Sequence, residues 1–112
     1  MENAIARLLD HYGTFTDGSS ALLRPELVAL CQEHSVSEAA FCDAFALELV
    51  RRFADGRLNA DGAAFAADDL HVAADFVLPP FARRILDLLE YREASPDEAR
   101  QVLERQGHGT AA

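Results

Sequence analysis

Apolar side chains in this chain recur every three or four residues, in segments that Gly and Pro separate. Such steps place side chains on one face of an α-helix, whereas a half-buried β-strand requires strict alternation of apolar and polar residues. The spacing therefore predicts an all-α fold. We expect a compact bundle of about six short helices, in which consecutive helices are mostly antiparallel because their connections are short.

Gly and Pro also indicate where several helices begin and end. A first helix should stop at Gly13, because Gly is favoured just after a helix C-terminus, and residues 14–20 should form a polar loop. Pro25 suits the first turn of a second helix that ends near His34, and Pro79-Pro80 suits the start of a fifth.

The longest apolar pattern predicts a third helix, over about residues 37–54, as the central core element. Ser35 and Ser37 are both N-cap candidates for it, and Ser35 stands at capping-box spacing from Glu38. Its buried stripe should comprise Phe41, Cys42, Phe45, Leu49 and Phe53.

Two further helices are predicted from their N-caps. Asn59 or Asp61 can cap a fourth helix, which contains Gly62 and is otherwise rich in Ala. The run Ser95-Pro96-Asp97-Glu98 combines an N-cap, a Pro at the first helical position and a capping-box Glu, and predicts a sixth helix over about 96–105. We expect residues 1–106 to form a single helical domain and residues 107–112 a flexible C-terminal tail.

Ten Arg, no Lys and nineteen acidic residues give the chain a net charge of −9. Direct binding to nucleic acid or to an anionic membrane is disfavoured, because both require basic side chains. A basic protein is the partner that this charge attracts. The start of the sequence is acidic where a signal peptide is basic, and no apolar run is long enough for a membrane span, so we expect a cytoplasmic location.

No pattern in the sequence indicates a cofactor, a metal site or catalysis. Residues 57–68 resemble a calcium loop, but Arg57 occupies the first ligand position, so capping of the fourth helix is the favoured interpretation. Asp68 and His71 share a helical face without a second copy of the pair. An enzyme would need His11 or His71 to meet an Asp or a Cys in a pocket. We expect Cys31 and Cys42 to be reduced core residues.

The acidic excess is uneven along the chain. Residues 41–80 hold seven acids against three Arg, and five of those acids are Asp residues around the predicted fourth helix. Short Asp side chains lose little entropy on binding, so this group is the candidate partner-binding site. A solvated face that only keeps the protein soluble is the competing interpretation. The five residues are Asp55, Asp61, Asp68, Asp69 and Asp75.

About a third of the chain resembles small acidic helical immunity proteins of bacterial toxin systems, including contact-dependent growth inhibition. The resemblance lies in the run Phe53-Ala-Asp-Gly-Arg-Leu58, in Ala67-Asp-Asp-Leu70 within an Ala-rich helix, and in Leu78-Pro-Pro80 before Ile85 and Leu89. It implies an inhibitor that binds a cognate toxin, commonly a basic nuclease, and blocks its active site or nucleic-acid surface. The alternatives are a helical adaptor that recognises its partner through an apolar groove or an oligomer interface, and a small helical enzyme.

Overall fold

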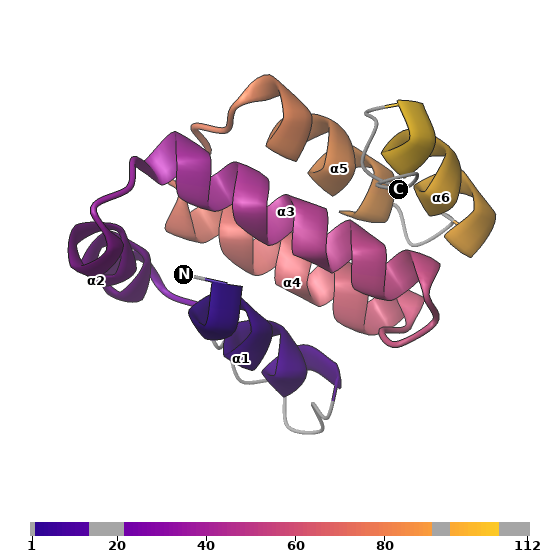
Figure 1. The fold of residues 1–112 in the computed structure, drawn as a ribbon, viewed down its shortest axis with the longest axis horizontal. Helices are drawn as coiled ribbons and strands as arrows, with labels where there is room; N and C mark the ends of the chain where they lie inside the picture. Colours follow the sequence, from indigo (N-terminus) through magenta and orange to yellow (C-terminus); the bar gives the residue numbers. More distant parts are fainter. Residues whose placement is uncertain (1, 14–21, 91–94, 106–112) are drawn as a thin grey trace.

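The described part of the chain, residues 2–13, 22–90 and 95–105, consists of helices and their connections in the computed structural model (Figure 1). It contains no strand, so the predicted all-α class is confirmed. The predicted loop at 14–20 and the predicted tail at 107–112 lie outside these residues. The six helices are α1 (Glu2–Gly13), α2 (Arg24–His34), α3 (Glu38–Ala54), α4 (Ala60–Ala73), α5 (Pro80–Glu90) and α6 (Pro96–Arg105).

Helix α3 is the centre of the bundle, as the sequence predicts, because it packs against each of the other five helices. Its aromatic stripe is buried, and the rings of Phe41 and Phe45 stack with their centroids 6.1 Å apart. Helices α3 and α4 are joined by the short connection 55–59 and run side by side in opposite directions, and α5 then turns back along α4 (Figure 1). The core therefore lies between α3 and the helices around it.

The N-caps explain where the helices begin. Ser37 caps α3, because its hydroxyl accepts a hydrogen bond from the Ala40 N–H at 3.0 Å. The competing candidate, Ser35, is wrong: it ends α2 in the left-handed conformation, with a φ of 55°, and so cannot also begin α3. Asn59 caps α4 through a 2.7 Å bond from the Gly62 N–H, and Ser95 caps α6 as predicted.

Helix α4 is rich in Ala because it is packed on several sides, against α1, α2, α3 and α5. Small side chains let these neighbours approach closely, and most of the Ala residues of α4 are buried. Gly62 marks the tightest contact: a Cβ there would lie 3.0 Å from Leu58 Cδ1 and 3.1 Å from the Tyr12 carbonyl oxygen. Packing, rather than helix propensity, therefore selects the composition of α4.

The Gly62→Ala substitution tests this explanation. Helix propensity alone would stabilise the variant by about 1 kcal/mol. Because the Tyr12 oxygen belongs to the backbone of α1 and cannot easily move, we expect crowding to prevail and the free energy of unfolding to fall by about 1–2 kcal/mol in urea titrations. The exposed Ala29 of α2, changed to Gly, measures the propensity effect alone. A Gly62→Ala protein more stable than the parent would contradict the close contact.

No helix in the described residues is both long and apolar enough to cross a membrane.

Candidate protein-docking surface

The five candidate Asp residues are spread along α4 rather than gathered in one cluster. Asp55 follows the last residue of α3, beside the start of α4, and Asp75 lies just beyond the end of α4. A helix of 14 residues is about 21 Å long, so Asp55 and Asp75 stand near opposite ends of α4. The structure therefore separates residues that the sequence places in one group.

Asp61 and Asp68 do share a face of α4. They are seven residues apart, which brings two helical turns into near register, and both are exposed. Phe65 lies between them and Val72 lies one turn after Asp68, so both belong to the same face, at steps of three and four residues. Phe65 is partly exposed and Val72 is 62% exposed. We call these four residues the α4 stripe: acidic and apolar side chains alternate along it.

Asp69 and Asp55 have local structural roles. The Asp69 carboxylate accepts a hydrogen bond from the Tyr12 hydroxyl, which ties α1 to α4. Asp55 forms an exposed ion pair with Arg57, with 3.0 Å between the charged atoms. Sequence alone could not assign the Asp69 contact, because Tyr12 is 57 positions away.

The connection after α4 presents apolar side chains that the sequence interpretation missed. Phe76 is 61% exposed and Val77 is 76% exposed. Asp75 and Phe76 both adopt the left-handed conformation, with φ angles of 57° and 61°. The Phe76 N–H donates to the His71 carbonyl at 2.9 Å, which closes the end of α4. The available signal was an apolar run, Phe76 to Leu78, outside the predicted helices.

Arg24 brings the start of α2 to this same end of the molecule. Its guanidinium donates to the Ala73 carbonyl, in the last turn of α4, at 2.9 Å and to the Glu38 carboxylate at 2.6 Å. Leu23, the residue before it, is 51% exposed. Among the described residues, the exposed large apolar side chains thus lie around the adjoining ends of α2 and α4. We call this group the turn patch; its members are Leu23, Val72, Phe76 and Val77.

A groove of about 460 Å³ lies beside the turn patch. Its walls include Val77 and Leu78, and its charged groups are Arg24, Glu38 and Asp75. Since Glu38 neutralises Arg24, the groove retains one acidic charge. It can accept a side chain that is apolar along its length and positively charged at its end.

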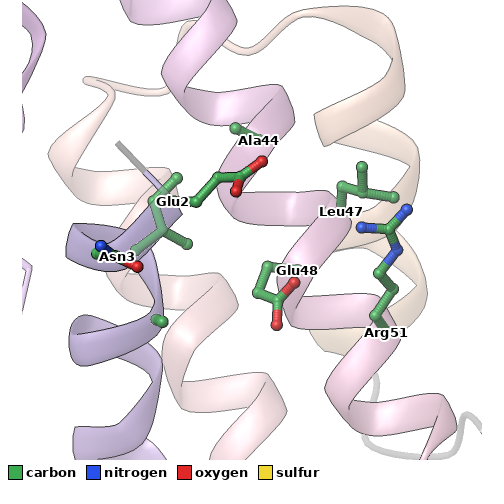
Figure 2. A pocket seen from close by; sticks show the side chains of 8 residues that line it. Glu2, Asn3, Ala44, Leu47, Glu48 and Arg51 are labelled. Carbon is green, nitrogen blue, oxygen red and sulfur yellow. The ribbon is translucent and has the colours of Figure 1, made fainter. Parts of the chain in front are cut away.

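The cavity between α1 and α3 has a mixed polar and apolar lining. Figure 2 shows Glu2 of α1 reaching toward Ala44 of α3, with Glu48 and Arg51 further along α3, around a space of about 320 Å³. The Glu48 carboxylate is 3.2 Å from Arg52, which also pairs with Asp10 of α1 at 2.7 Å. These ion pairs join α1 to α3 beside the cavity.

His71 forms the most chemically suggestive pair. Its Nδ1 lies 2.7 Å from the Glu90 carboxylate, and its ring is 5.1 Å from that of Phe76. The pair links α4 to α5, but His71 lines neither the groove beside the turn patch nor the cavity in Figure 2. The His71–Glu90 pair is thus a contact between two helices. Within the described residues, no three His, Cys, Asp or Glu side chains converge as metal ligands.

The two cysteines are free and buried, as predicted. Burial raises the pKa of the Cys42 thiol to about 11 and also raises the pKa of Cys31. A thiol with a raised pKa remains protonated at neutral pH and is a poor nucleophile. Neither cysteine has the environment of a catalytic residue.

Comparison with known proteins adds no assignment: no protein-family model, no curated protein and no solved structure matches this chain.

Proposed function

We propose that this chain is a non-enzymatic immunity protein of a bacterial toxin system and acts in the cytoplasm. It binds and neutralises a basic toxin, and a nuclease is the class of toxin that best fits its charge. The observation that carries the proposal is the α4 stripe, in which the exposed Asp61 and Asp68 alternate with Phe65 and Val72 on one helical face. Such a stripe offers both charge and apolar area to one partner.

Electrostatics supports this partner class. A net charge of −9 accelerates encounter with a basic surface and repels nucleic acid. A nuclease carries basic side chains where it holds the phosphate backbone, so an acidic helix face can occupy the same surface. Because Asp61 and Asp68 sit on a regular helix rather than on a loop, they are held at a fixed spacing before binding, which reduces the entropy lost in the complex.

The proposal is tested in cells by expressing the genes that neighbour the gene for this chain, because we expect one of them to encode the toxin. We expect co-expression of the chain to restore growth to cells that express the toxin domain, and the Asp61→Arg/Asp68→Arg variant to protect markedly less at equal abundance. The Glu33→Arg/Glu104→Arg variant is the matched control, because it also changes two exposed acids and gives the same net charge of −5, that is −9 + 4. If the parent chain protects against no neighbouring gene product, the proposed function is wrong.

A helical adaptor that recognises its partner through apolar contacts is the second candidate. The turn patch favours it, since Phe76 and Val77 are large, apolar and more than half exposed. An adaptor of this kind would bind with little dependence on salt, whereas an acidic inhibitor binds much faster at low salt.

A further inference from the structure

We propose that the turn patch is the apolar anchor of the docking surface and that its occupant is a basic amphipathic segment of a protein partner. In this arrangement Phe76 and Val77 contact the apolar face of the segment, while the acids nearby receive its Arg or Lys side chains. The inference deepens the proposed function and rests on it for the existence of a protein partner, but it does not require that partner to be a toxin.

Exposed apolar side chains are concentrated at the end of α4. Single exposed apolar residues are ordinary on protein surfaces, and a group of them in one place is not. In the described residues the large ones occur together, at the ends of α2 and α4 that Arg24 joins through the Ala73 carbonyl. Burying side chains of this size against a partner strengthens binding.

The backbone that presents Phe76 has an unusual conformation. A left-handed conformation is unfavourable for a bulky residue, and helices that end in this way usually place Gly there. Here two successive non-Gly residues, Asp75 and Phe76, adopt it. Glycine would adopt this conformation at lower cost, so Phe76 presents its large side chain from a strained backbone, as residues in binding sites often do.

The charge around the turn patch determines which occupant fits it. Asp68 lies one turn before Val72, Asp75 directly precedes Phe76, and Glu38 neutralises the nearby Arg24. A second copy of the chain would bring two charges of −9 together, which opposes self-association. A segment with apolar residues on one face and Arg or Lys beside them matches both the apolar side chains and the acidic charge of the turn patch.

The geometry also suggests how the segment is held. The groove lined by Val77 and Leu78 adjoins the exposed face of the turn patch and contains the carboxylate of Asp75. One Arg or Lys of the segment can lay its aliphatic stem along Val77 and bring its charge to Asp75. Phe76 then serves as the central contact, because aromatic side chains dominate the binding energy of protein interfaces.

The experiment is an NMR titration of the isotope-labelled full chain with two synthetic helical peptides of equal charge. The first peptide carries Arg along one face and Leu on the other, and the second replaces every Leu by Ser. We expect the Arg/Leu peptide to shift the backbone amides of residues 72–77 and to bind about tenfold more tightly than the Arg/Ser peptide. Because Phe76 and Val77 are exposed, the Phe76→Ser/Val77→Ser variant should stay folded, as circular dichroism will check, and should bind both peptides with the weaker affinity.

Equal affinities for the two peptides, or shifts confined to the groove between α1 and α2 that Leu8 and Leu30 line, would overturn the inference. Dimerisation through the patch in sedimentation equilibrium would also overturn it, since the occupant would then be a second copy. This experiment and the co-expression test can fail separately. If the Arg/Leu peptide binds preferentially at residues 72–77 but the chain protects no cells, the turn patch stands as a docking site and the proposed toxin partner is wrong. If the chain protects cells but shows no such preference, the proposed function stands and the turn patch is not its apolar anchor.

Discussion

Replacing Phe45 by Ala is expected to lower the free energy of unfolding by about 3–5 kcal/mol. Phe45 is fully buried in α3, its ring stacks on that of Phe41, and α3 contacts every other helix. The cavity left by the ring would therefore lie inside the hydrophobic core around α3. Because small domains are stable by only about 5–15 kcal/mol, urea titration followed by circular dichroism should show a large shift of the midpoint.

The matched control is Phe76→Ala, the same change at a side chain that is 61% exposed. It removes little buried area, and we expect a change in the free energy of unfolding of no more than about 0.5 kcal/mol. Similar losses for the two variants would mean that Phe45 does not occupy the centre of the core.

The helices were predictable because their signals are local. Apolar spacing, the Ser95 cap and the Pro residues at helix starts act within a few residues, and tertiary packing does not reverse them. Ser35 shows the limit of such signals: its spacing from Glu38 fits a capping box, but the chain needs that residue to end α2. The left-handed end of α4 gave no signal, because neither Asp75 nor Phe76 is Gly.

The candidate site was less predictable because its side chains are assigned by tertiary contacts. Sequence grouped five Asp residues by their proximity along the chain. Only the fold distinguishes Asp69, which holds Tyr12 of α1, from Asp61 and Asp68, which lie on the exposed face of α4. Equally, an apolar run such as Phe76 to Leu78 is normally buried, and its exposure depends on how α2, α4 and α5 meet.

The α4 stripe also explains why charge and apolar area have to be tested by different measurements. Steering by exposed acids acts on the association rate and weakens with salt, whereas apolar contacts act mainly on the dissociation rate. Asp69 and Asp75 are unsuitable for a charge test, because Asp69 bonds to Tyr12 and Asp75 has a strained backbone. Asp61 and Asp68 are the pair to reverse, because both are exposed on one face of α4.

The most direct test of the α4 stripe is therefore the association rate of the chain with the toxin domain that the co-expression test identifies, measured by stopped flow for the Asp61→Arg/Asp68→Arg variant. We expect this rate to fall about 10- to 100-fold at low ionic strength and less than about threefold near 0.5 M salt. The control Glu33→Arg/Glu104→Arg has the same net charge, with its changes near the far end of α2 from Arg24 and on α6, which does not contact α4. It should retain most of the parent's rate. Equal rates for the two variants at low salt would contradict a docking surface on α4.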